Sequence, residues 1–311
     1  MQFFQTPNID FVGRRRIAYF VSLSLFVLGL VSMVVRGGLN LGIDFKGGTS
    51  VQIRFEESLT TDQIRDALAV EDLANSEIKS IGSQNEYLIY IEQQQGVTAS
   101  DMAKKVENAI QTALPSAQYE IMKTDTVGPK IGQELRRATI LAIILALLLI
   151  LIYVGWRFEF VFAVGAIAAL FHDVIITLGI FSIINYELSL KEIAAFLTIV
   201  GYSLNDTIVV YDRIRENLKL MRSEDLTEIM NKSINQVLSR TIVTSLTTFF
   251  VLLILVIFGG EVIRGFSLAM MIGVLVGTYS SIFVASPLVL EWQMRHGGKQ
   301  KLRMAKKKRS R

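Results

Sequence analysis

The sequence has no cysteine and only two histidines among its 311 residues. Without cysteine the chain has no thiolate nucleophile and no disulfide, and the commonest zinc ligands are scarce. The sequence also lacks a Walker phosphate loop, a GxSxG nucleophile elbow and an HExxH zinc motif. These absences argue against covalent or metal-dependent catalysis. We therefore expect a protein that is not an enzyme and that needs no metal or organic cofactor.

Charge is absent from long stretches of the chain. Hydrophobic residues make up 51% of the sequence, and six runs are apolar and long enough to cross a bilayer as helices. The sequence thus predicts an α-helical polytopic membrane protein, in which Gly273 and Gly277 suit close helix packing. We expect the first run to be an uncleaved anchor, because it lacks the short apolar core and cleavage site of a secretory signal. The runs cover residues 17–35, 138–154, 160–184, 193–210, 241–258 and 266–290.

The region between the first two runs has the composition of a small soluble domain. Alternating or β-branched stretches predict four strands, and two longer periodic stretches predict helices. Their order, βαββαβ, is typical of a ferredoxin-like fold with two helices on one face of a sheet. Thr60 and Gln63 are placed to form a capping box at the start of the first helix. The strands are expected at 49–55, 77–81, 87–92 and 118–123, and the helices at 61–73 and 98–114.

A short glycine-containing motif, Asp44-Phe45-Lys46-Gly47-Gly48, precedes the first predicted strand. Its two glycines permit positive φ angles and close approach of the backbone. The pattern by itself fits a plain strand-entry turn as well as it fits a functional motif.

Positive charge is concentrated near the C-terminus. Eight Lys or Arg residues and no acid fall within residues 299–311. Such a block is typical of a disordered solubilising end. The alternative is a tail that stays near anionic lipid or ribosomal RNA, and no specific nucleic-acid partner of a folded domain is expected. The positive-inside rule, applied to this tail and to 211–240, places both termini in the cytoplasm, although Arg136 and Arg137 count mildly against it. We expect an N-terminus with helix 1 (1–36), an external domain (37–130), helices 2–6 (131–292) with a cytoplasmic amphipathic segment (211–238), and a basic tail (293–311).

Asp206, next to Asn205, is the one charged residue in the run 193–210. A carboxylate inside a membrane helix costs about 2.5 to 3.5 kcal/mol on insertion scales and usually has a function. Arg240 precedes the next run and is predicted to meet Asp206 at one depth, with Thr244 on the same face as Arg240. Burial favours the neutral acid and a nearby guanidinium favours the carboxylate, which outlines a proton switch. A static Asp206–Arg240 pair that only fixes helix packing remains the alternative.

His172 and Asp173 lie near the middle of the third run. Adjacent positions on a helix point about 100° apart, so at most one of the two can face Asp206. We predict Asp173 as a relay partner in proton transfer. The alternative is that the two residues hydrogen-bond to Ser or Thr side chains on neighbouring helices, which is a common role of isolated polar groups in membranes.

Several distinctive motifs lie along the chain. They lie at 44–48 (DFKGG), 127–132 (VGPKIG), 172–177 (HDVIIT), 201–210 (GYSLNDTIVV) and 212–217 (DRIREN), and at 240–241, 244–245 and 265–267. Through these motifs the chain resembles, over nearly its whole length, the SecF family of bacterial protein-export subunits within the RND superfamily.

The resemblance implies a multi-pass subunit of the cell inner membrane that pairs with SecD and associates with the SecYEG translocon and the accessory subunit YajC. Such a subunit uses the proton motive force to promote late steps of the translocation of unfolded preproteins. The residues matching Asp206 and Arg240 carry proton coupling in that family, with Asn205 and Thr244 nearby and a further Asp supplied by SecD. The motif residues Asp44, Phe45, Gly47 and Gly48 belong to the periplasmic domain.

Two other functions are compatible with the sequence. One is an RND-type proton-coupled exporter of small molecules or lipids, and the other is a static assembly subunit without ion coupling. The sequence also leaves open whether the coupling ion is H⁺ or Na⁺.

Overall fold

The computed structural model describes residues 7–81, 85–91, 99–221 and 223–295. Most of the predicted basic tail lies outside the described residues. The chain forms two compact units, Leu41–Ala142 and Met1–Asn40 with Ile143–Arg311. We refer to them as the sheet domain and the helical bundle.

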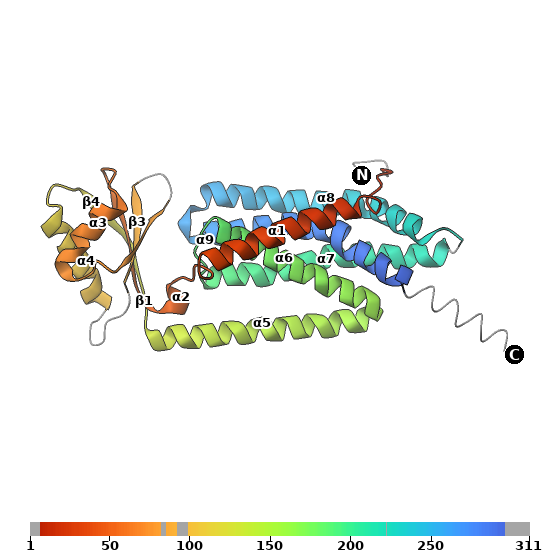
Figure 1. Cartoon of the computed structure of the whole chain (residues 1–311), viewed down its shortest axis with the longest axis horizontal. Coiled ribbons are helices and arrows are strands. Elements are labelled where there is room, and N and C mark those ends of the chain that lie inside the picture. Colours follow the sequence, from red (N-terminus) through yellow and green to blue (C-terminus); the bar gives the residue numbers. More distant parts are fainter. Residues whose placement is uncertain (1–6, 82–84, 92–98, 222, 296–311) are drawn as a thin grey trace. The chain divides into compact units, whose positions relative to one another are not determined.

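The sheet domain has the predicted βαββαβ order (Figure 1). Its four strands form one antiparallel sheet in the order β2-β3-β1-β4, and α3 and α4 cover one face of it. This confirms the predicted fold. The elements are β1 (Gly48–Phe55), α3 (Thr61–Leu68), η1 (Ala69–Glu71), β2 (Glu77–Ile81), β3 (Glu86–Ile91), α4 (Ala99–Ala113) and β4 (Tyr119–Val127).

Alternation along the central strand determines which face of the sheet is covered. Val51, Ile53 and Phe55 of β1 belong to a buried cluster with apolar residues of α3 and α4. Successive strand residues point to opposite faces, so this period of two aligns one apolar side with the helices. The predicted capping box is also confirmed, because the Thr60 side chain accepts from the Gln63 backbone N–H and the Gln63 side chain accepts from that of Thr60.

The Asp44–Gly48 motif overlaps a single helical turn, α2 (Ile43–Lys46), which leads into β1. The sequence pattern fitted a plain strand-entry turn and a functional motif equally well. Gly47 and Gly48 follow with φ angles of 73° and 129°. A Cβ atom on Gly48 would lie 2.5 Å from the Ile91 carbonyl oxygen, so no other residue fits there. A Cβ on Gly132 would lie 3.2 Å from the Gly47 nitrogen, which shows that the two glycine-containing motifs of the domain pack against each other.

Glu77, on the edge strand β2, pairs with Lys46 of α2 and with Lys79 of its own strand. Lys46 Nζ lies 3.2 Å and Lys79 Nζ 3.0 Å from its carboxylate oxygens. Partial burial opposes ionisation of Glu77, but hydrogen bonds and charge from Lys79, and then from Lys46, outweigh it and lower the pKa of Glu77 below its ordinary value. Because the folded pKa is below the unfolded one, these pairs stabilise the domain above the unfolded pKa, and that contribution is lost as the pH falls through the folded pKa.

We therefore expect Glu77→Gln to loosen β2 at pH 7 by up to about 1 kcal/mol, since half-exposed pairs contribute little. Hydrogen exchange of the β2 and β3 amides, corrected for intrinsic rates, measures the difference between variant and wild type. The difference should shrink toward zero at pH 3. A difference of equal size at both pH values would mean that the effect of the substitution is not electrostatic.

The helical bundle contains the predicted spans. Among the described residues, six helices are long and apolar enough to cross a membrane, which confirms the predicted number. The predicted segment 211–238 belongs to two helices. Its first ten residues extend α7, and its second half is the start of α8, which begins at Leu226, capped by Asp225, and continues directly into the fifth span. The helices are α1 (Arg15–Val35), α5 (Pro129–Arg157), α6 (Phe160–Ile183), α7 (Leu190–Leu220), α8 (Leu226–Phe258) and α9 (Gly260–Ser280).

Glycines lie where these helices cross most closely. Gly29 of α1 and Gly179 of α6 touch through their backbones, since a Cβ on Gly29 would lie 2.7 Å from the Gly179 Cα. On α9, a Cβ on Gly273 would lie 2.3 Å from the Ile199 side chain, and a Cβ on Gly277 would lie 3.0 Å from the Ser203 Cβ. Small residues of this kind allow close packing in membranes, where dispersion forces replace the hydrophobic effect.

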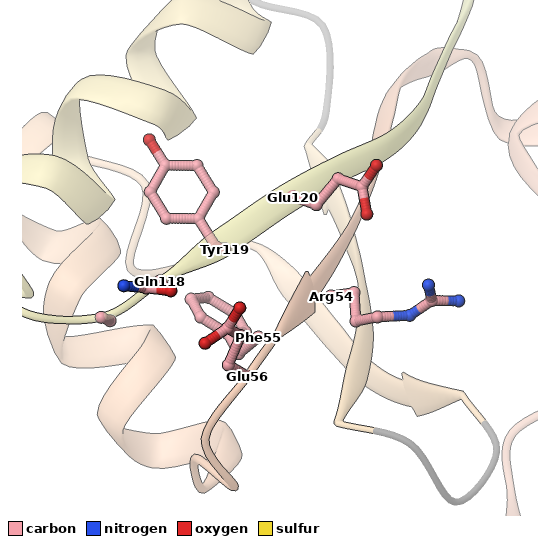
Figure 2. A pocket seen from close by; sticks show the side chains of 7 residues that line it. Arg54, Phe55, Glu56, Gln118, Tyr119 and Glu120 are labelled. Carbon is pink, nitrogen blue, oxygen red and sulfur yellow. The ribbon is translucent and has the colours of Figure 1, made fainter.

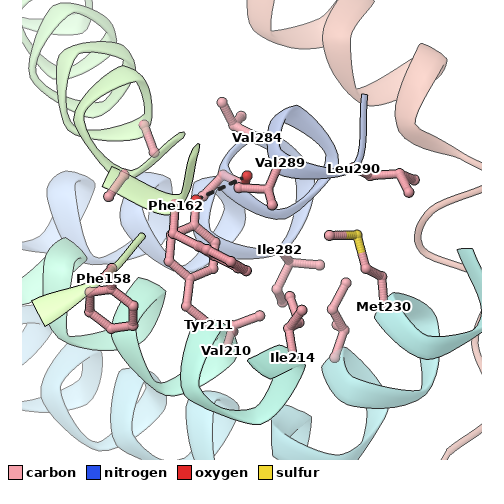
Figure 3. Packing of buried hydrophobic residues seen from close by; sticks show 14 of the residues in the cluster. Phe158, Phe162, Val210, Tyr211, Ile214, Met230, Ile282, Val284, Val289 and Leu290 are labelled. Carbon is pink, nitrogen blue, oxygen red and sulfur yellow. Dashed lines mark hydrogen bonds between the residues drawn. The ribbon is translucent and has the colours of Figure 1, made fainter. Parts of the chain in front are cut away.

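Helix α9 widens into a π-helix, η2 (Ser281–Ala285), before the chain continues as an α-helix to Arg295. Figure 3 shows that the fully buried Tyr211 of α7 donates a hydrogen bond to the Ala285 carbonyl, 3.1 Å away. A Cβ on Gly165 would lie 2.5 Å from the Tyr211 hydroxyl, so glycine leaves room for that bond. Wide turns of this type often accompany functional sites, and this one directly follows Ser280, a residue of the site described next.

Candidate functional site

The first polar centre of the bundle surrounds Asp206, which is 3% exposed. The Ser245 hydroxyl of α8 donates to Asp206 Oδ2 over 3.3 Å, and the Thr278 hydroxyl of α9 donates to Ser245 Oγ over 2.7 Å. We call Asp206, Ser245 and Thr278 the Asp206 centre. Two successive hydrogen bonds thus join α9 to α8 and α8 to the Asp206 carboxyl of α7.

The predicted neighbours of Asp206 lie at the edge of this centre. Asn205, Arg240 and Thr244 are exposed. Within the described part of the chain Arg240 makes no ion pair with Asp206 at 4.0 Å or less, although its positive charge still acts on that carboxyl. Thr244 donates to the carbonyls of Arg240 and Thr241, each 3.0 Å away, so it is not the hydroxyl that reaches Asp206.

Sequence reasoning missed Ser245 by one position. Adjacent helix residues differ by about 100° in direction, and the rotation of α8 against α7 depends on contacts that no local pattern encodes. A hydroxyl residue beside Thr244 was the available signal. Tyr202, on the Asp206 side of α7, also reaches α8, where its hydroxyl donates to the Thr244 carbonyl over 3.2 Å.

The second polar centre is formed by His172 and Asp173 of α6. Asp173 is 1% exposed, and its Oδ2 accepts hydrogen bonds from Ser203 of α7 over 2.5 Å and from Ser280 of α9 over 2.7 Å. Its other oxygen, Oδ1, is 2.9 Å from His172 Nδ1. These contacts with serines on neighbouring helices are of the kind expected if the two residues hold helices together, which was the predicted alternative to a relay role for Asp173.

The imidazole of His172 extends this centre to α1. Its Nε2 is 2.9 Å from Ser22 Oγ, which is 3.1 Å from the Tyr279 hydroxyl. The Tyr279 hydroxyl in turn donates to the Ala18 carbonyl over 2.7 Å, and the Tyr279 ring stacks on the imidazole. We call His172, Asp173, Ser22 and Tyr279 the His172 centre.

Helices α7 and α9 connect the two centres. Ser203 and Asp206 are three positions apart on α7, one turn of helix, and Thr278 and Ser280 are two positions apart on α9. Both centres therefore form hydrogen bonds with residues of α7 and α9.

The sheet domain has a pocket of about 520 Å³ where β1 ends and β4 begins. In Figure 2 Phe55, Glu56 and Gln118 lie together on one side of the pocket, while Arg54 extends away from them. Arg54 is already paired with Glu86. Within the described ranges no three His, Asp or Glu side chains are grouped to hold a metal ion. The motif residues Asp44, Phe45, Gly47 and Gly48 also lie in the sheet domain, where the two glycines serve the packing described above.

Comparison with known proteins shows which families this chain is similar to. A family model described as "Protein export membrane protein SecD/SecF, C-terminal" matches residues 105–295, and one described as "SecD/SecF GG Motif" matches residues 31–58. The chain is 45% identical to the protein translocase subunit SecF of Rhodothermus marinus over 98% of this chain and 100% of that protein. It is 44% identical to that of Calditerrivibrio nitroreducens, covering 91% and 93% of the two chains.

Among solved structures, the fold is similar to the crystal structure of SecDF, a translocon-associated membrane protein from Thermus thermophilus. The TM-score is 0.83 with 40% sequence identity, and the match covers 92% of this chain and 39% of that longer one. A structure of SecDF in a super-membrane-facing form matches with a TM-score of 0.68 and 38% identity over 96% of this chain and 40% of that one.

Proposed function

The chain belongs to the SecF family of protein translocase subunits, and on this basis we propose that it pairs with a SecD subunit to drive late steps of preprotein translocation through SecYEG with the proton motive force. The single observation that supports ion coupling most strongly is the burial of Asp206 inside a membrane helix. An intramembrane acid is costly to keep, so its presence argues for a function.

The contacts of Asp206 fit a group that changes charge. A carboxylate can accept about four hydrogen bonds, yet within the described ranges Asp206 accepts one, over 3.3 Å from Ser245. The charged form is therefore poorly solvated unless the Arg240 guanidinium moves in, and the neutral form needs no cation. Arg240 is exposed and has a long flexible side chain, so it is free to approach and withdraw.

The face that carries Asn205, Arg240 and Thr244 supports a membrane partner. These polar side chains are exposed within spanning helices. Gly201, one turn before Asn205, also faces open space in the described structure, because no atom beyond its own stretch of helix lies within 4 Å of where its Cβ would lie. Polar groups are not left facing lipid. We assign this face to SecD, whose family supplies a further Asp that would meet Arg240.

Orientation follows from charge. With the Lys- and Arg-rich segments 211–240 and 299–311 inside, both termini lie in the cytoplasm of a cell with an inner membrane, and the sheet domain lies in the periplasm. There it would meet the unfolded preprotein that emerges from SecYEG. YajC is expected as an accessory subunit of the same assembly.

The coupling ion is tested by an export assay in inverted vesicles that contain this chain and its SecD partner. We expect a protonophore to abolish the stimulation of export that the pair provides, and replacement of Na⁺ by K⁺ to leave that stimulation unchanged from pH 6 to 8. Vesicles without the pair give the baseline. Loss of stimulation only when Na⁺ is removed would assign the coupling to Na⁺, and stimulation that survives both treatments would rule out ion coupling.

A further inference from the structure

We propose that the His172 centre is a second proton-binding site, in which rotation of two hydroxyl groups lets His172 gain or lose a proton without movement of a helix. The use of this site in export rests on the proposed function. The site itself rests on the geometry of four side chains from three helices.

The first step is to fix the proton on Nδ1. Ionised Asp173 offers only acceptors, and its Oδ1 lies 2.9 Å from His172 Nδ1. Nδ1 must therefore carry a hydrogen in both protonation states of the ring. The variable position is Nε2, which is 2.9 Å from Ser22 Oγ.

The second step is to count hydrogens along the chain from Nε2. With neutral His172, Nε2 has a lone pair and accepts from the Ser22 hydroxyl, which in turn accepts from Tyr279. With protonated His172, Nε2 donates to Ser22, Ser22 donates to Tyr279 across 3.1 Å, and Tyr279 donates to the Ala18 carbonyl across 2.7 Å. Every donor has an acceptor in both states, because hydroxyl groups donate and accept and rotate freely.

The third step concerns charge. Asp173 is bonded to Ser203, Ser280 and His172, and three donors stabilise a buried carboxylate. Asp173 and Tyr279 are the titratable groups that hydrogen-bond to or stack on His172 or Ser22 in the described residues. The groups of α1 and α7 that hydrogen-bond to the centre, Ser22 and Ser203, are neutral hydroxyls, and the titratable Asp206 lies one turn beyond Ser203 on α7. When His172 takes up a proton it forms an ion pair with Asp173, and the centre carries no net charge. When His172 releases the proton, the Asp173 carboxylate remains, stabilised by its hydrogen bonds to Ser203, Ser280 and His172.

Exposure identifies the entry point for the proton. The His172 side chain is 11% exposed and that of Asp173 is 1% exposed. The imidazole is therefore the end of the centre that meets an incoming proton, and Asp173 is the fixed counter-charge behind it.

The chain allows a direct test because its two histidines are His172 and His296. In the His296→Gln variant of the full chain, ¹⁵N-labelled histidine in lipid bilayers reports on His172 alone by solid-state NMR. We expect a neutral ring protonated on Nδ1 at high pH and a ring protonated on both nitrogens at low pH, within pH 5 to 9. A ring that keeps one protonation state across this range would overturn the proposal.

Ser22 provides the matched pair of variants. Ser22→Thr keeps the hydroxyl and should keep the titration. Ser22→Ala removes the partner of Nε2 and should change the midpoint of the titration, because both protonation states of the ring lose their hydrogen bond to the hydroxyl. An unchanged midpoint in Ser22→Ala would show that the hydroxyl chain has no part in binding the proton.

Failure of this inference is separable from failure of the proposed function. Asp206→Asn should leave the His172 titration unchanged, because it removes a group of the other centre. If export needs Asp206 and the gradient but His172 never titrates, the second site is wrong and the proposed function stands. If His172 titrates but export does not depend on the gradient, the second site stands and the proposed function is wrong.

Discussion

Asp206→Asn should abolish the part of export that depends on the ion gradient and leave the amount of assembled complex unchanged. Asparagine has the size of aspartate, and its Oδ1 can still accept the 3.3 Å bond from Ser245. It cannot bind and release a proton, and it no longer attracts Arg240. Export should therefore fall to the level measured after the gradient is collapsed.

The measurement is preprotein export in vesicles with and without a gradient, together with co-purification of SecD as a test of assembly. Asp225→Asn is the matched control, since Asp225 caps α8 and asparagine caps a helix as well as aspartate does. Its gradient response should equal that of the wild type. Normal gradient-driven export by Asp206→Asn would remove Asp206 from the coupling mechanism.

The same variant distinguishes a switch from a static pair. If Asp206 and Arg240 only fixed helix packing, Asp206→Asn would leave Arg240 without its counter-charge and reduce assembly. The double variant Asp206→Asn with Arg240→Gln would then restore export, because a neutral pair can pack as well as a charged one. A switch predicts intact assembly in the single variant and no rescue in the double variant.

The parts of the fold that depend on local pattern were predictable. The uncharged runs predicted the six spans, and alternation in 49–55 and 87–92 predicted two strands of the sheet. Both patterns depend only on residues that are close together in the sequence. The end of a span was less predictable. Polar residues continue a helix as readily as apolar ones, so α8 begins fifteen residues before the fifth apolar run.

The site was predictable only where a residue is unusual by itself. Asp206 stands out as a lone acid in an apolar run, but Ser22 is one of many serines and its partner His172 is 150 positions away. The spacing of Ser22, Gly29 and Ser32 along α1 is a weak signal that these small residues share one helix face. Which helix that face meets is decided by tertiary contacts, among them the Gly29–Gly179 crossing.

The substitution Gly179→Leu at this crossing should detach α1 from α6. A Cβ on Gly179 would lie 2.8 Å from the Gly29 Cα, and backbone atoms cannot move aside as a side chain can. Overpacking of this kind costs about 1 to 3 kcal/mol or more, which lowers the ratio of docked to undocked α1 about fivefold or more. Separation would also break the bond between Ser32 and Ser182 and that between Ser22 and His172.

The absence of cysteine makes this measurable. Ser32 and Ser182 have hydroxyl oxygens 2.9 Å apart, so a Ser32→Cys, Ser182→Cys pair should crosslink efficiently in a background with no other thiol. Gly155→Leu on α5 and Gly201→Leu on α7 are matched controls, because at both positions a Cβ would meet no described atom within 4 Å outside the local helix. Both should crosslink like the parent, and Gly201→Leu alone should lose SecD, since it blocks the face assigned to that partner. Parental crosslinking in Gly179→Leu would show that α1 docks on α6 without the glycine contact, and other contacts, such as the bond between Ser22 and His172, would then hold the crossing.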